Sequence, residues 1–313
     1  MASLSAILAA SPSPPVARRR GGIRALAAFP LPGLGLLVAA DGFGCAAGGF
    51  AVTRFWGILA ATLLLLAIAL LYATLRPRPA IAGMAGHAAL WVGFSAAGAV
   101  LTYLAATADL PLRDGWLRAA DAALGFDWAR PAGWVGRHGV AAAVLRLAYF
   151  SLLPQIALSI ALHARARPER NREMLGAAML ALVPTVALSL LLPALGPGAA
   201  PGAPPTADLA YLAPLLALRH GTLHVFALPV MQGIVTFPSY HAALAVSIAA
   251  SHRGTRAFRG FVVVEALVLA ATPPIGGHYL SDVLAGLAIA LPSVLLAARR
   301  SRPAAAAPAR GGG

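Results

Sequence analysis

The chain has 313 residues, of which 59% are hydrophobic and 11% are charged. This composition excludes a soluble globular domain and indicates a membrane protein, because several stretches approach the roughly 20 apolar residues that cross a bilayer. The formal net charge of +14 comes from arginine alone, since the chain contains no lysine. The arginines lie in short runs between apolar stretches, which is the positive-inside pattern and argues against a nucleic-acid partner.

The first part of the chain predicts an arm followed by membrane spans. Residues 1–24 place their arginines after a short apolar run, which is the reverse of a secretory signal. They predict a disordered basic cytoplasmic arm, with an organellar transit peptide as the alternative. Residues 25–107 predict N-terminal transmembrane spans at about 26–50, 55–75 and 81–107.

The next segment, residues 108–139, differs because charges of both signs alternate with Trp116, Trp128 and Trp134. Indole rings prefer the membrane–water interface, so the mixture predicts an extracytoplasmic amphipathic segment lying on the membrane surface. A solvated loop is the alternative.

Residues 140–298 are expected to form the catalytic membrane core. Five further spans are expected, at about 140–163, 174–196, 237–251, 259–274 and 278–298. Dense arginine runs follow the first, third and fifth of these, and they mark the cytoplasmic side. The chain is therefore predicted to be an all-α polytopic transmembrane bundle. Both termini, including a disordered tail at 299–313, are expected in the cytoplasm, and the loop at 197–236 is expected outside.

Two polar clusters begin apolar helices near the end of the chain. Pro238, Ser239 and His241 stand at the start of one helix, and His278 and Asp282 stand at the start of the next but one. Under the predicted orientation, both clusters lie at the extracytoplasmic face. This convergence of two histidines and a carboxylate predicts a catalytic site.

The residue types suggest the chemistry of this site. His278 and Asp282 are spaced i, i+4, so they share a helix face and the carboxylate can accept a proton from one imidazole nitrogen. That contact fixes the tautomer and directs the other nitrogen outward as a nucleophile. His241 is placed to protonate a leaving oxygen as a general acid. Taken singly, each residue is equally consistent with an ordinary buried polar side chain.

Neighbouring residues suit an anionic substrate. Gly276 and Gly277 allow an anion to approach backbone amides closely. Ser239 can hydrogen-bond a phosphate oxygen at the start of its helix. Ser239 and Gly277 are therefore predicted to bind substrate phosphate.

Residues 237–243 and 276–286 resemble the second and third signature motifs of the type 2 phosphatidic acid phosphatase superfamily. They are most similar to its inositolphosphotransferase-like branch, which contains the inositol phosphorylceramide synthases. The resemblance covers residues from about 140 to 298. It implies a six-helix core and metal-independent phosphoryl transfer from a lipid phosphate through a phosphohistidine. It also implies that His278 is the nucleophile, Asp282 its orienting residue and His241 the acid, with no metal or cofactor.

Two departures from the superfamily pattern affect phosphate binding. The first motif begins with lysine, which this chain lacks, and Ala271 and Thr272 stand where the third motif usually has Ser-Arg. Phosphoryl transfer still needs positive charge on the phosphate oxygens. The candidates are Arg219, Arg146 and Arg137. Arg219 is favoured because its loop leads into the first polar cluster, although it could instead hold that loop at lipid headgroups.

Three functions stay open on the sequence. The enzyme could hydrolyse a lipid phosphate, or it could transfer a phospho-headgroup to or from an alcohol such as inositol. The third possibility is a transporter or a catalytically inert structural membrane protein. Transporters typically have internal repeats and broken helices with charges at the midplane, whereas no repeat is evident in this sequence and its polar clusters are predicted at a membrane face. A membrane lipid is the expected partner, and the arginine-only, alanine-rich composition favours a bacterial inner membrane.

Overall fold

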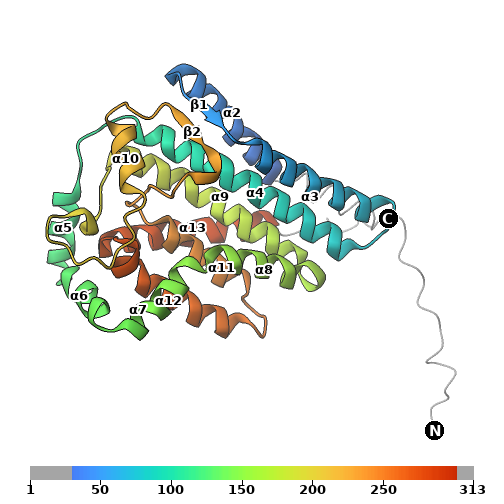
Figure 1. Ribbon diagram of the computed structural model, residues 1–313. Helices are drawn as coiled ribbons and strands as arrows, with labels where there is room; N and C mark the ends of the chain where they lie inside the picture. Colours follow the sequence, from blue (N-terminus) through green and yellow to red (C-terminus); the bar gives the residue numbers. More distant parts are fainter. Residues whose placement is uncertain (1–29, 302–313) are drawn as a thin grey trace, which may run out of the picture.

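The computed structural model describes residues 30–301 (Figure 1). The predicted arm at 1–24 and nearly all of the predicted tail at 299–313 lie outside these residues. Almost all regular structure within residues 30–301 is helical, which confirms the all-α prediction. Within the described part of the chain, six helices are long and apolar enough to cross a membrane: α2 (Pro30–Gly48), α3 (Trp56–Thr74), α4 (Pro79–Ala106), α9 (Pro168–Leu191), α12 (Phe258–Gly276) and α13 (Leu280–Ser301).

The span predicted at 140–163 is two helices rather than one. α7 (Gly139–Phe150) and α8 (Leu152–Ala166) meet at Ser151 with a bend of 53°. Pro154 explains the break, because it lacks the N–H that would bond to the Phe150 carbonyl in a continuous helix. At the bend, the Ser151 hydroxyl donates to the Ala148 carbonyl at 2.6 Å.

The span predicted at 237–251 corresponds to a short helix, α11 (Tyr240–Ser251), of 12 residues. It rises about 18 Å, which is less than the roughly 30 Å of a bilayer's hydrocarbon core. α11 packs among α8, α9, α12 and α13. Its surroundings are therefore mostly protein, and its first turn lies inside the bundle.

Helices α9 and α13 pack against each other, α4, α8, α11 and α12 lie around them, and α7 packs on the outer side against α12. α2 and α3 lie outside this group, against α4 (Figure 1). Small residues allow the closest contacts. A Cβ atom at Gly286 of α13 would collide with the Ser239 carbonyl, and one at Gly98 of α4 would lie 3.1 Å from Leu182. α13 can therefore approach the start of α11 closely.

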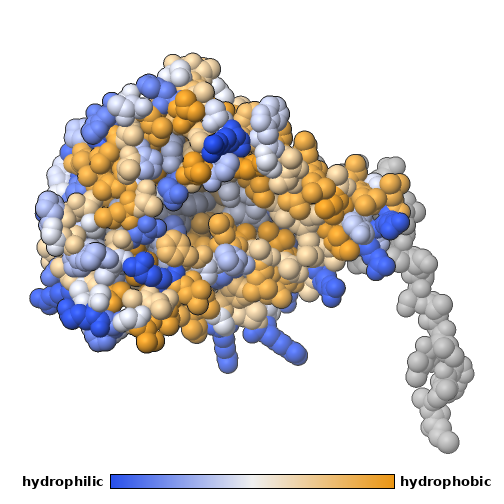
Figure 2. Space-filling model, viewed as in Figure 1, coloured by the Kyte–Doolittle hydropathy of each residue, from blue (hydrophilic) through white to orange (hydrophobic). Residues whose placement is uncertain are grey.

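One end of the bundle carries most of the irregular structure (Figure 1). It contains α5 (Asp114–Ala123), α6 (Ala129–Arg137), α10 (Leu212–Arg219) and two 3₁₀ turns, η2 (Pro197–Ala199) and η3 (Leu228–Val230). Strands β1 (Ala51–Thr53) and β2 (Val225–Ala227) pair in parallel there, with Val52 opposite Phe226. Figure 2 shows hydrophilic residues gathered at this end and hydrophobic residues along the long helices.

Candidate active site

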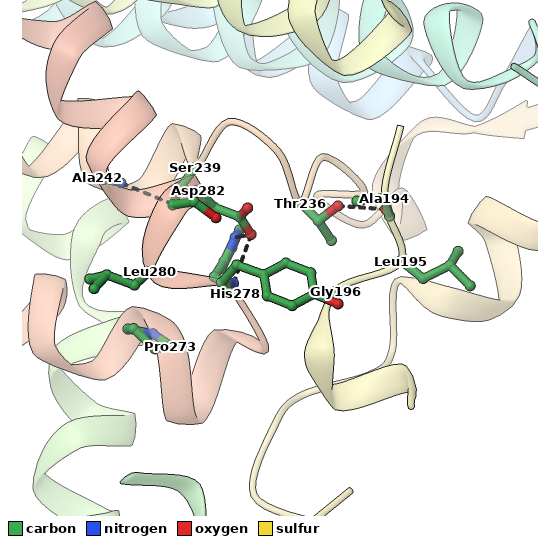
Figure 3. Close-up of polar contacts among 12 residues, drawn as sticks. Ala194, Leu195, Gly196, Thr236, Ser239, Ala242, Pro273, His278, Leu280 and Asp282 are labelled. Carbon is green, nitrogen blue, oxygen red and sulfur yellow. Dashed lines mark hydrogen bonds and ion pairs between the residues drawn. The ribbon is translucent and has the colours of Figure 1, made fainter. Parts of the chain in front are cut away.

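His278 lies in the short connection between α12 and α13, and Asp282 lies in the first turn of α13. The two side chains face each other, with 3.2 Å between His278 Nδ1 and Asp282 Oδ2 (Figure 3). The same carboxylate oxygen accepts the Tyr279 backbone N–H at 2.9 Å. Both side chains are buried. This pair has the geometry of an imidazole oriented by a carboxylate.

The surroundings of His278 favour a neutral ring. Burial lowers the pKa of its imidazole to about 4, and the nearby Thr236 backbone carbonyl opposes this shift. Thr236 is itself fixed, because its hydroxyl donates to the Ala194 carbonyl at 2.5 Å (Figure 3). At neutral pH the ring is therefore uncharged, which is the form that a nucleophilic histidine requires.

The second histidine of the site, His241, belongs to α11. It lies in the first turn of α11, and its ring centroid is 6.5 Å from that of His278. The Ser239 backbone N–H donates to the Asp282 backbone carbonyl at 2.9 Å, which joins the start of α11 to the start of α13. The structure therefore brings His241, His278 and Asp282 together.

Tyr149 of α7 forms the wall behind His241. The two rings stack with centroids 4.4 Å apart and planes only 9° from parallel. Gly276 makes room for this wall, because a Cβ atom there would lie 2.7 Å from the Tyr149 ring. Gly277 has a left-handed backbone, with φ of 69°, that ends α12 and starts the turn to His278. Gly276 thus leaves space for the Tyr149 ring, whereas Gly277 adopts the left-handed backbone conformation that ends α12.

Two carboxylates of α5, which the sequence analysis left among surface charges, support the turn that carries His278. Asp121 is buried and accepts the backbone N–H groups of Leu280 and Ser281, each at 2.8 Å. Asp114 accepts the N–H of Gly196 at 2.8 Å and lies 3.3 Å from the Tyr279 hydroxyl. The i, i+7 spacing, which places both on one helix face, was the available signal.

A profile of the PAP2 superfamily matches residues 115–296, more than half of the chain. The chain belongs to the PAP2 superfamily. No curated protein and no solved structure matches it. Membership and the long apolar helices fit a membrane phosphatase. The matched region begins before the motif resemblance, and it includes Asp121 on α5.

In this PAP2 chain, the Ser239 and Gly277 groups that were predicted to bind phosphate already make other contacts. Ser239 is buried, and its hydroxyl caps α11 by accepting the Ala242 N–H at 3.4 Å. The Gly277 N–H donates to the Pro273 carbonyl at 3.1 Å. Both groups therefore have intramolecular partners. Among residues 30–301, no three His, Cys, Asp or Glu side chains are grouped to hold a metal ion.

Two of the three arginine candidates, Arg146 and Arg219, occupy different parts of the site end. Arg146 lies one turn before Tyr149 on α7 and donates to the Thr206 carbonyl at 3.1 Å. Arg219 of α10 is nearly buried and pairs with Asp109 at 2.8 Å. Another arginine near the site, Arg118 of α5, was not among the candidates of the sequence analysis. It lies beside Tyr279 and opposes the rise in the pKa of that phenol, which burial causes.

Proposed function

We propose that this PAP2 protein is an integral membrane enzyme that removes a phosphoryl group from a lipid phosphate, or transfers a phospho-headgroup such as inositol phosphate, through a phosphohistidine on His278. The observation that carries the proposal is the buried His278–Asp282 pair at 3.2 Å, with His241 beside it. The oriented, neutral imidazole is suited to attack phosphorus, and a second histidine is suited to move the proton.

In the first step, His278 attacks phosphorus with the nitrogen that does not face Asp282. A P–N bond forms and the P–O bond to the leaving alcohol breaks. His241, protonated when the anionic phosphate is bound beside it, gives its proton to that oxygen, and Asp282 stabilises the positive charge that develops on the His278 ring. The leaving group departs as a neutral alcohol, and the enzyme holds a phosphohistidine.

In the second step, His241 takes a proton from water or from an acceptor alcohol. The resulting oxygen attacks phosphorus, an O–P bond forms and the P–N bond breaks. His278 returns to its neutral form. Water as acceptor gives a phosphatase, and an alcohol such as inositol gives the phosphotransferase expected for the inositolphosphotransferase-like branch.

Arg146 is the arginine that best suits phosphate binding. It lies on the same helix as Tyr149, which stacks on His241. Arg219, favoured by the sequence analysis, already pairs with Asp109 and donates to the Leu110 carbonyl at 2.8 Å. Moving it to the phosphate would break both contacts, so we assign it to the support of its loop.

We also propose that the site faces the extracytoplasmic side of a bacterial inner membrane, with both termini in the cytoplasm. The support is the separation of the bundle's two ends (Figure 1). The site lies at the end with α5, α6 and α10. The turns between α3 and α4, between α8 and α9, and between α11 and α12 carry arginine runs at the other end, the pattern of cytoplasmic loops.

Turnover of a panel of lipid phosphates by the purified protein in detergent, with EDTA present, tests the proposed reaction. Free phosphate and new phospholipids are followed together by mass spectrometry, with His278→Ala as the blank. Free phosphate that the native protein releases and His278→Ala does not release supports a phosphatase. A new headgroup-bearing lipid supports a phosphotransferase. Arg146→Gln should lower turnover more than Arg219→Gln. Turnover that persists in His278→Ala would contradict the mechanism, and no turnover of any substrate would favour an inert structural protein.

A further inference from the structure

An apolar groove runs along the outside of the bundle, away from the catalytic turn. It encloses about 410 Å³ between α3, α4 and α8. Its walls are apolar side chains, among them Leu65, Met84, Ala88, Trp91, Ile156 and Ala157. None of these three helices carries a residue proposed to act on phosphate. The groove, called here the α4–α8 groove, is therefore separate from the candidate active site.

The dimensions of the α4–α8 groove suit one hydrocarbon chain. Its α4 wall extends from Ile81 to Val92. These residues rise about 16 Å along the helix, which is close to half of the roughly 30 Å hydrocarbon core. The groove thus spans about one leaflet, and its apolar lining excludes a polar occupant.

One mouth of the groove carries positive charge. Arg78 caps α4 three residues before Ile81, and Arg165 follows Ala161 by one turn on the same face of α8. Arg76 precedes them in the turn after α3. All three side chains are exposed, and none forms an ion pair with another of the described residues. These free guanidinium groups stand where the headgroup of a lipid in the groove would lie.

We propose that the α4–α8 groove is a binding site for an anionic phospholipid of the leaflet on the arginine side. One acyl chain fills the groove, and the lipid phosphate contacts Arg78 and Arg165. Arginine near a membrane surface attracts anionic lipids, and the apolar wall supplies the rest of the binding energy. A free phosphate ion lacks the chain, so the site is specific for the lipid.

Trp91 allows the site to be tested, because its ring lines the groove. The full chain is reconstituted into phosphatidylcholine vesicles that contain either brominated phosphatidylglycerol or brominated phosphatidylcholine. Bromine quenches nearby tryptophan fluorescence, and the difference between the native protein and Trp91→Phe gives the Trp91 signal. We expect brominated phosphatidylglycerol to quench that signal at a clearly lower mole fraction, by roughly fivefold for each arginine at the mouth.

Three variants establish the cause. Arg78→Ser combined with Arg165→Ser should remove the preference for the anionic lipid. Arg256→Ser combined with Arg259→Ser removes the same charge from the α11–α12 junction and should retain it. Both control arginines are exposed, and α12 packs on α7 and α11 rather than on the groove helices. Ala157 is exposed in the groove, so Ala157→Leu fills space without disturbing the packed core and should reduce quenching by both lipids.

Several results would overturn the proposal. Equal quenching by the two lipids would mean that the groove has no preference for a negative headgroup. No quenching of the Trp91 signal by either lipid would mean that no chain enters the groove. A preference that survives the Arg78 and Arg165 substitutions, or one lost equally in the control pair, would place the recognition elsewhere. Circular dichroism of each variant checks that the helices are retained.

Discussion

Asp121 joins α5 to α13, the helix that carries Asp282. Its two oxygens accept the Leu280 and Ser281 N–H groups, which belong to the first turn of α13 and have no partner within that helix. The same contacts fix the position of His278 two residues before Leu280. Asp121 is therefore a positioning residue for the proposed reaction, and its carboxylate acts through the backbone.

Asp121→Ala should weaken both the fold and the reaction. Two buried N–H groups lose their acceptors, which is expected to cost about 2 kcal/mol or more of the free energy of unfolding. Small displacements of a nucleophile are costly, so kcat should fall at least about tenfold while KM changes little. Thermal unfolding and steady-state kinetics measure the two effects, and Asp121→Asn, which keeps one acceptor oxygen, should recover part of each.

Asp127→Ala is the matched control for that substitution. Asp127 lies in the same segment, but it is exposed and pairs with exposed Arg130 at 3.5 Å. Its removal should change the free energy of unfolding by less than about 1 kcal/mol. Equal effects of the Asp121 and Asp127 substitutions would contradict the positioning role.

The pH dependence of stability tests whether His278 is buried in its neutral form. Its pKa is about 4 in the folded protein and about 6.5 in an unfolded chain. Between these values the unfolded state binds more protons, so stability rises with pH and is lost as pH falls from 6.5 toward 4. The full effect is roughly 3 kcal/mol.

The measurement is the free energy of unfolding across this pH range for the native protein and for His278→Asn. The native protein should lose more stability on acidification than the variant does. Parallel curves would show that the imidazole titrates alike in both states, which contradicts a buried neutral ring.

The sequence predicted that His241, His278 and Asp282 lie together, but it did not reveal the contacts that hold them in place. His241, His278 and Asp282 stand in two short motifs whose spacing carries chemical meaning. Asp121 acts on backbone groups about 160 positions away, and only the packing of α5 against α13 reveals this. Arg219 was favoured because its loop leads into the first polar cluster, and only the structure shows that its guanidinium pairs with Asp109.

At the scale of helices, apolar length predicted most elements and local breaks were missed. Seven of the eight predicted spans coincide with a helix or helix pair that is long and apolar enough to cross a membrane, whereas the one at 237–251 coincides with the 12-residue helix α11. The bend at Ser151 was not predicted. Pro154 lies in the middle of the predicted span, and transmembrane helices tolerate internal prolines, as α9 does at Pro184, so Pro154 alone could not decide. The short strands β1 and β2 also depend on pairing between distant segments.

The end of α12 supplies a direct test of the wall behind His241. Gly276→Ala puts a Cβ atom 2.7 Å from the Tyr149 ring, so the ring must move away from its stacked position on His241. We expect turnover to fall at least about tenfold. Gly260→Ala is the control, because it lies in the same helix with nothing within 4 Å of the added atom. Turnover of that control should stay within roughly twofold. Similar turnover for both variants would contradict a role for the Tyr149 wall.

At the scale of the whole molecule, each end of the bundle has its own polar network. The site end contains the carboxylates Asp114, Asp121 and Asp282. At the other end, Glu173 pairs with Arg170 at 2.9 Å and with Arg253 at 2.7 Å. This second network joins the start of α9 to the end of α11. Both ends are thus fixed by contacts between helices. The sequence predicted the His278–Asp282 contact at the site end, but not the contacts of Asp114, Asp121 or Glu173.

The orientation of the bundle can be tested with single cysteines in a Cys45→Ala background. Ala210→Cys lies at the site end and Ala166→Cys lies at the arginine end, and both native side chains are exposed. In bacterial spheroplasts, a membrane-impermeant maleimide should label Ala210→Cys directly. Ala166→Cys should react only after the membrane is opened, because arginine-rich loops stay in the cytoplasm. The reverse pattern would contradict an extracytoplasmic site.

Detection of a phosphoryl group on His278 would be the most direct evidence for the proposed reaction. The native protein is mixed with a lipid phosphate that it turns over, quenched in alkali during turnover, digested and analysed by mass spectrometry. We expect one phosphoryl group on the peptide that contains His278, and none in His278→Ala. A phosphoryl group on another residue, or rapid turnover with His278 unmodified at every time point, would contradict the phosphohistidine mechanism.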